Sequence, residues 1–219
     1  MYQNIRDNVR GLLAEIPPGI GIVAAAKSRT QDEIAAALDS GIAIIGENFV
    51  QEAEAARNII GGRPLWHFIG HLQLNKVRKA VELFDLIETV DNLAVAQAID
   101  RHAAAAGKIM PVLIEVNIGR EARKNGVLPE SMGDLARSIA GLQNLRLSGL
   151  MTMGPRLDPE KLRPYFAETR RLFETLRAEN LKGADIRYLS MGMSDSYRVA
   201  IEEGANLVRL GTAIFGPRR

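Results

Sequence analysis

The sequence has 219 residues, of which 47% are hydrophobic and 25% are charged, and its formal net charge is +2. The chain has no cysteine, which excludes disulfides, thiolate catalysis and cysteine-ligated zinc and fits a reducing cytoplasm. It also lacks a signal peptide at its start, an apolar stretch of the roughly 18 residues that span a bilayer, and a basic run interleaved with aromatic residues, so we expect a cytoplasmic protein that binds neither membranes nor nucleic acids.

The apolar residues alternate along the chain between helical spacing and short continuous runs. A leading helix is predicted over residues 3–15. Eight strands are predicted at 22–26, 42–45, 66–69, 86–89, 112–117, 145–150, 186–190 and 207–210. Seven further helices are predicted at 31–38, 50–60, 75–83, 92–106, 132–140, 159–179 and 195–203.

Eight strands that alternate with helices indicate a parallel sheet with right-handed crossovers. Eight such units in 219 residues favour a closed (β/α)8 TIM barrel over an open sheet. No linker or low-complexity segment divides the chain, so we expect residues 1–219 to form one domain that includes the extra N-terminal helix. In such a barrel, functional side chains gather where the strands end.

Lys27 closes the apolar run of the first predicted strand, just before a helix-start signal at residues 28–30. A lysine there places an amine at the barrel mouth, partly shielded from water by small apolar neighbours. Loss of solvation disfavours the ammonium form, and the neutral amine is the form that attacks an aldehyde. The alternative is a strand-end lysine whose amine simply reaches solvent.

The second and third strands also end in polar residues. Asn48 follows the second strand, either as an amide at the mouth or as the cap of the next helix. His67 and His71 flank the end of the third strand, and no carboxylate joins them, so no metal site is predicted. Of the two, His71 is the candidate for the mouth. Met151 ends the sixth strand and suits either core packing or contact with a flat ring.

The last two strands run into Gly/Ser turns, which contain Ser194 before one helix and Gly211 and Thr212 after the final strand. Hydroxyls and free backbone N–H groups at helix starts bind anions, and barrels often hold phosphate after strands seven and eight. A lysine facing a phosphate site predicts a phosphorylated aldehyde, for which pyridoxal 5′-phosphate is the obvious candidate. Arg209 lies on the same strand face as Gly211, where its guanidinium can face the pyridine nitrogen; the alternative is a salt bridge at the rim.

Six segments together strongly resemble the pyridoxal phosphate homeostasis protein family. They are residues 23–30, 46–52, 66–73, 149–152, 189–194 and 209–216. The resemblance covers nearly the whole chain and implies a barrel similar to the N-terminal domain of alanine racemase. Two departures are Ala25-Ala26, where the family usually has Val-Ser, and the loop at 123–126, which usually reads closer to Ser-Lys-x-Gly.

The resemblance also implies residue roles. Lys27 would hold pyridoxal 5′-phosphate as a Schiff base, and Arg209 would face the pyridine nitrogen. Residues Ser194, Gly211 and Thr212 would hold the phosphate, while Asn48, His71 and Met151 would line the pocket. Members of the family are thought to bind and buffer this cofactor, which implies a role in vitamin B6 homeostasis.

Three functions remain open from the residues. The first is a non-catalytic carrier of pyridoxal phosphate, which is favoured because we expect none of the four tyrosines opposite Lys27 and no β-domain after Arg219. The second is a slow amino-acid racemase with Lys27 as one base, and the third is an aldolase that bonds a sugar phosphate directly. For the carrier, we expect a monomer whose recipients are pyridoxal-phosphate-dependent apoenzymes.

Overall fold

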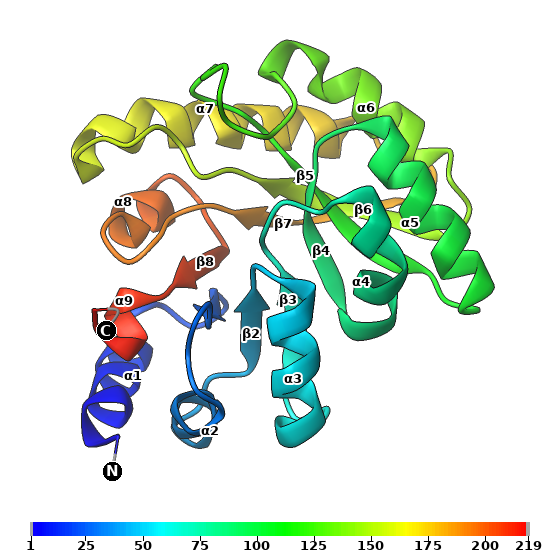
Figure 1. The fold of residues 1–219 in the computed structure, drawn as a ribbon. Coiled ribbons are helices and arrows are strands. Elements are labelled where there is room, and N and C mark those ends of the chain that lie inside the picture. The colour runs from blue at the N-terminus through cyan, green and yellow to red at the C-terminus, as the bar shows by residue number, and fades with distance from the viewer. Residues whose placement is uncertain (1, 218–219) are drawn as a thin grey trace.

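The computed structural model describes residues 2–217, in which eight parallel strands form a closed barrel in chain order (Figure 1). The strands are β1 (Gly21–Ala25), β2 (Ile44–Glu47), β3 (Leu65–Phe68), β4 (Leu86–Val90), β5 (Met110–Glu115), β6 (Leu145–Met151), β7 (Ala184–Ser190) and β8 (Leu207–Leu210). β8 pairs with β1 and closes the ring. The predicted (β/α)8 barrel is therefore confirmed.

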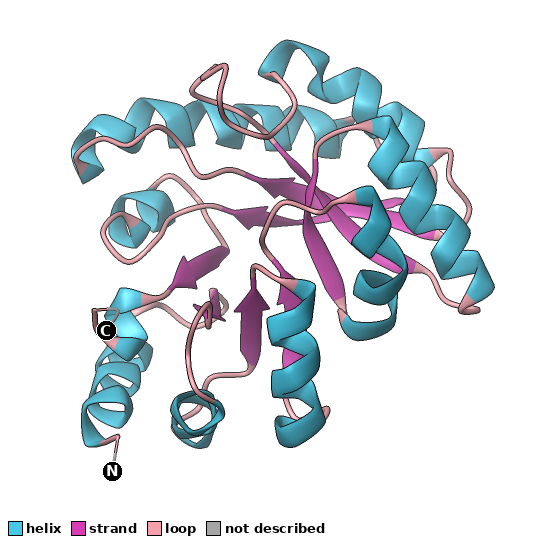
Figure 2. Cartoon of the chain, in the orientation of Figure 1, coloured by secondary structure: helices cyan, strands magenta, loops and turns pink. Residues whose placement is uncertain are grey.

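Helices lie outside the ring of strands (Figure 2). They are α1 (Gln3–Glu15), α2 (Gln31–Asp39), α3 (Val50–Ile60), α4 (Val77–Leu83), α5 (Leu93–Ala105), α6 (Met132–Ala140), α7 (Pro159–Ala178), α8 (Tyr197–Glu202) and α9 (Thr212–Phe215), with short 3-10 turns at Leu74–Lys76 and Pro129–Ser131. The predicted leading helix, α1, packs against α2 and α9, which brings the two ends of the described chain together (Figure 1). No helix within residues 2–217 is long and apolar enough to cross a membrane.

Two element boundaries differ from the sequence prediction in ways that matter for the site. β2 extends through Gly46 and Glu47, whose residue types disfavour strands, because backbone pairing with β1 and β3 continues there. α8 begins at Tyr197 instead of 195, because Ser196 and Tyr197 donate backbone hydrogen bonds to the Met193 carbonyl and form a turn. This turn leaves Ser194 in a loop at the barrel mouth.

The strands bury side chains both toward the helices and toward one another. Between strands and helices lies the main core, which includes Trp66, Phe68, Phe84 and Phe166. Two small apolar clusters contain Val23, Ile69 and Leu207 in one and Leu86, Leu113 and Met151 in the other. The strands also contribute buried polar side chains, among them His67, Glu88, Ser190 and Arg209.

Gly149 marks an irregularity on β6 that shapes this interior. The register of β6 against β7 shifts between Leu147 and Gly149. Gly149 has φ of 148°, and a Cβ there would lie 1.8 Å from the Tyr188 carbonyl oxygen. Only glycine allows the two strands to approach so closely at this bulge.

Candidate functional site

Lys27 lies two residues beyond the end of β1, in the loop that leads to α2. The predicted strand ends at residue 26, one residue later than β1 does, and the Ala26 amide still donates to the Gly46 carbonyl at 2.9 Å. The lysine is half-buried, and its Nζ lies 4.9 Å from the centre of the Phe49 ring. The amine thus lies over an aromatic face at the barrel mouth.

A pocket of about 400 Å³ opens beside this amine. We call it the lysine pocket. Its lining comes from the end of β3 and from the segments that follow β1, β2 and β3, including the start of α3: Lys27, Asn48, Phe49, Val50, Gln51, Phe68, Gly70, His71, Leu72, Gln73 and Lys76. The structure therefore brings together three of the predicted site residues, Lys27, Asn48 and His71.

Two of these loops are packed backbone against backbone. A Cβ on Gly70 would lie 2.2 Å from the Asn48 carbonyl oxygen, so this position accepts no side chain. Phe49, not Asn48, is the N-cap residue of α3, and no side chain caps that helix. The alternative that Asn48 caps the helix is thus wrong.

The predicted phosphate residues form a separate feature, which we call the amide cradle: Ser194 and the backbone N–H groups of Gly211 and Ala213. The two amides donate to Ser194 Oγ, each at 3.1 Å. Their convergence on one oxygen is the arrangement that binds an oxyanion. Thr212, between them, is exposed.

The amide cradle adjoins the end of β1. Ala24 and Leu210 are register partners on β1 and β8, and a Cβ on Gly211 would lie 3.6 Å from the Ala25 carbonyl oxygen. Lys27 follows Ala25 by two residues. The cradle and the lysine pocket therefore lie at the same end of the barrel, on loops that leave neighbouring strands.

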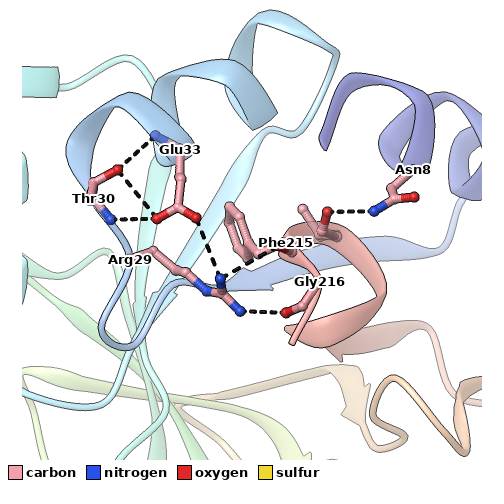
Figure 3. A network of polar contacts seen from close by, with 7 residues as sticks. Asn8, Arg29, Thr30, Glu33, Phe215 and Gly216 are labelled. Atoms are coloured by element: carbon pink, nitrogen blue, oxygen red, sulfur yellow. Dashed lines mark hydrogen bonds and ion pairs between the residues drawn. The ribbon is translucent and has the colours of Figure 1, made fainter. Parts of the chain in front are cut away.

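A polar network braces these two loops (Figure 3). Arg29 forms an ion pair with Glu33 at 3.4 Å and donates to the Gly216 carbonyl at 2.5 Å, across the boundary between the β1–α2 loop and α9. Thr30 and Glu33 form a reciprocal capping box at the start of α2. The network holds the segment after Lys27 against α9, the short helix that contains Ala213 of the amide cradle.

Arg209 points into the barrel and is 5% exposed. Its guanidinium donates to Ser190 Oγ at 2.6 Å and to the Thr152 carbonyl at 2.8 Å. The alternative of a salt bridge at the rim is therefore wrong. Beneath it, Glu88 accepts from Ser190 at 2.6 Å and pairs with His67 Nδ1 at 2.7 Å.

His67 and Met151 lie away from the lysine pocket. His67 is buried against Glu88, whereas His71 is exposed at the pocket, so the two histidines do not converge. Met151 is fully buried in the barrel interior and packs with Leu86 and Leu113. Its position is that of a core residue below the mouth.

Sequence reasoning missed the carboxylates of this site. Glu88 is the one acidic residue of β4, whose residues are all buried, and this was the available signal. Burial raises its pKa, but hydrogen bonds and charge from His67, Arg209 and Ser190 outweigh burial and hold the pKa below its usual range. Glu88 is therefore ionised at neutral pH.

Two other buried carboxyl groups, those of Glu115 and Glu47, have raised pKa values. Burial, reinforced by the charge of Asp91, raises the pKa of Glu115 to about 7 although Arg209 opposes the change. Burial and the nearby charge of Glu52 raise the pKa of Glu47 to about 8. The first group lies at the end of β5 inside the barrel, and the second lies at the end of β2 beside the lysine pocket.

Known proteins resemble this chain over nearly its whole length. The family described as "Alanine racemase, N-terminal domain" matches residues 2–219. A pyridoxal phosphate homeostasis protein from Aquifex aeolicus is 40% identical over 200 residues, which is 90% of this chain and 87% of the relative. One from Escherichia coli strain K12 is 38% identical over 206 residues, covering 92% of this chain and 87% of the relative.

Solved structures agree with this result. PipY of Synechococcus elongatus, solved with pyridoxal phosphate bound, matches with a TM-score of 0.89 at 32% identity, covering 97% of this chain and all of PipY. An alanine racemase from Clostridium difficile matches with a TM-score of 0.81 at 17% identity, covering 98% of this chain and 56% of the racemase, and shows likeness of fold alone. The chain belongs to the pyridoxal phosphate homeostasis protein family and has the fold of the alanine racemase N-terminal domain.

Proposed function

We propose that this protein binds pyridoxal 5′-phosphate at the mouth of its barrel and acts in vitamin B6 homeostasis as a carrier of that cofactor. The observation that carries the proposal is the placement of the half-buried Lys27 amine and the amide cradle at one end of the barrel, with Gly211 against Ala25. The relatives named for pyridoxal phosphate homeostasis and the PipY structure with the cofactor support it.

The residues fit the two ends of this cofactor. The cradle amides already hold one oxygen, that of Ser194, and a phosphate oxygen offers the same acceptor with more charge. Ser194 and the Thr212 hydroxyl are the further donors we assign to the phosphate. At the other end, Nζ of Lys27 condenses with the aldehyde, which forms a C=N bond and releases one water.

The remaining site residues receive lesser roles. Asn48 and His71 line the lysine pocket and bound the space around the cofactor. Met151 supports the interior from below, because it is buried among apolar side chains. Arg209 is the residue assigned to the pyridine nitrogen.

Bound pyridoxal phosphate supplies an aldehyde and an aromatic ring that withdraws electrons when its nitrogen is protonated. A guanidinium does not give up its proton at neutral pH, so Arg209 keeps that nitrogen unprotonated and weakens the ring as an electron sink. Within residues 2–217, no tyrosine lines the lysine pocket. These features favour a carrier over an amino-acid racemase.

The partners of the carrier follow from this role. We assign pyridoxal-phosphate-dependent apoenzymes as recipients, to be tested by whether the loaded protein reconstitutes an apo-aminotransferase while a phosphatase destroys free cofactor. Failure under these conditions would show that transfer requires release. A cytoplasmic location, a monomeric state and a single domain over residues 1–219 stay predictions.

The attachment is tested by loading the purified protein with pyridoxal phosphate, reducing with borohydride and mapping the labelled peptide. The label is expected on Lys27. Lys76 is the matched control, because it is the other lysine that lines the lysine pocket. K27A should lose the label while K76A keeps it; a label that persists in K27A and disappears in K76A would refute the assignment.

A second assay separates carrier from racemase. The loaded protein is incubated with single L-amino acids in deuterated water, and exchange of the α-proton is followed by NMR. The carrier is expected to leave the α-proton in place over times much longer than binding takes. Efficient exchange that depends on Lys27 would establish the racemase instead.

A further inference from the structure

The barrel interior contains a buried polar cluster formed by His67, Glu88, Ser190 and Arg209, each from a different strand. Their exposed fractions are 4%, 0%, 0% and 5%. Of these residues, only Arg209 has a role in the proposed function. None of the four lines the lysine pocket or belongs to the amide cradle.

The hydrogen bonds in the buried polar cluster have a fixed direction. An arginine only donates and an ionised carboxylate only accepts, whereas a serine hydroxyl does both. Arg209 therefore donates to Ser190, and Ser190 donates to one oxygen of Glu88. The other Glu88 oxygen accepts from Nδ1 of His67, so that ring nitrogen carries a proton.

This arrangement fixes the guanidinium at two nitrogens. One terminal nitrogen donates to Ser190, and the other donates to the Thr152 carbonyl on the neighbouring strand end. Thr152 is itself held, because its hydroxyl donates to the Val116 carbonyl at 2.8 Å. These two hydrogen bonds determine the guanidinium plane before any ligand is bound.

The charges in the cluster also balance. Glu88 lies 3.9 Å from Arg209, close enough to offset the guanidinium charge in a site that water does not reach. Ser190 sits between them and uses its hydrogen bonds to link the two. Removal of either partner would leave an uncompensated buried charge.

We propose that Ser190 and Glu88 are positioning residues, which orient the Arg209 guanidinium toward the ring nitrogen of the cofactor, and that His67 holds Glu88 in place for this purpose. The inference rests on the proposed function, since it needs a cofactor ring for Arg209 to face. It adds three residues below the site that set how the ring is bound.

The test compares S190A with S148A. Ser148 is the matched control: it is 1% exposed on the neighbouring strand β6, and its hydroxyl bonds only the nearby Arg146 carbonyl at 3.2 Å. Loss of one hydrogen bond to a charged group corresponds to about a tenfold rise in dissociation constant. We expect S190A to raise the Kd for pyridoxal phosphate about tenfold and to shift the absorption band of the bound cofactor. S148A should change neither.

A double-mutant cycle distinguishes positioning from general loosening of the fold. In an R209K background, S190A should change the Kd less than about twofold, because the group it positions is already altered. Equal effects of S190A in both backgrounds would refute the inference. If S190A does not fold, S190C takes its place in the cycle, because a cysteine is similar in size to serine but forms only weak hydrogen bonds.

A measurement on the cofactor-free protein completes the test. The side-chain guanidinium signal of Arg209, followed by 15N NMR, should be protected from solvent exchange in the wild type and in S148A and should lose that protection in S190A. Unchanged protection in S190A would also overturn the inference. If borohydride fails to label Lys27 in the wild type, the proposed function fails; if Lys27 is labelled and S190A behaves like S148A, only the positioning role fails.

Discussion

The buried carboxyl group of Glu47 should make the free energy of unfolding depend on pH, and substitution of this residue should remove its contribution. Its side chain is 2% exposed, and its Oε2 is buried without a hydrogen-bond partner among the described residues. Burial and the Glu52 charge raise its pKa to about 8, against 4.5 for an ordinary glutamate. The folded protein therefore binds this proton more tightly than the unfolded chain does.

The sign and size follow from proton linkage. Because the folded pKa is the higher one, the stabilisation is complete below pH 4.5 and is lost as the pH rises to about 8. A difference of one pH unit between the folded and unfolded pKa corresponds to about 1.4 kcal/mol, so the full loss is at most about 5 kcal/mol. Glu115, whose pKa is about 7, adds a similar loss below that pH. Because Glu115 is unchanged in a Glu47 variant, its loss cancels when the variant is compared with the wild type.

E47Q mimics the protonated carboxyl group and should remove this dependence. We expect E47Q to exceed the free energy of unfolding of the wild type by less than about 1 kcal/mol at pH 5 and by about 2–4 kcal/mol at pH 8. Urea denaturation followed by circular dichroism from pH 5 to 9 measures both. E54Q is the control, because Glu54 lies on the surface in an ion pair with Lys79 and should change stability by less than about 1 kcal/mol. If the free energies of unfolding of E47Q and the wild type change with pH in the same way from pH 5 to 9, Glu47 does not titrate as described.

Two further substitutions test the amide cradle and the lysine pocket. T212V should weaken binding of pyridoxal phosphate by about 1–3 kcal/mol through one lost hydrogen bond to the phosphate, while T212S should bind like the wild type. If calorimetry gives equal affinities for the two variants, Thr212 does not bind the phosphate. G70A should lower stability by about 1–3 kcal/mol, because its Cβ would meet the Asn48 carbonyl at 2.2 Å. G62A is the control, because a Cβ there would meet nothing within 4 Å. Its stability in thermal melting should stay within about 1 kcal/mol of the wild type. A G70A variant as stable as G62A would show that the two loops can separate.

The order of elements could be predicted because apolar periodicity reports burial directly. The strands of a parallel barrel are covered on both sides and read as short apolar runs, as β1 does. The end of β2 was harder to place, since Gly46 and Glu47 enter the strand through backbone pairing that residue type does not reveal. The four-residue helix α9 was missed because it is too short for a periodic pattern.

The candidate site could be predicted only in part, for a related reason. Lys27, Asn48 and His71 follow strand ends, and the barrel rule brings such residues to one face. The partners of Arg209 could not be found in this way. Glu88 and Ser190 are separated by 102 positions, and only strand register inside the closed barrel brings them within 2.6 Å.

The contents of the barrel argue that its buried charges serve the site and not the fold. Apolar clusters that include Val23, Leu207 and Leu86 show that these strands also bury apolar side chains against one another. A buried ion pair is seldom more stabilising than apolar side chains of similar volume. Glu88 and Arg209 are nevertheless buried as a charged pair. This disadvantage in stability is explained if cofactor binding needs a fixed, charged guanidinium facing the bound ring. A variant in which apolar residues replace both Glu88 and Arg209, and which binds the cofactor as tightly as the wild type, would contradict that explanation.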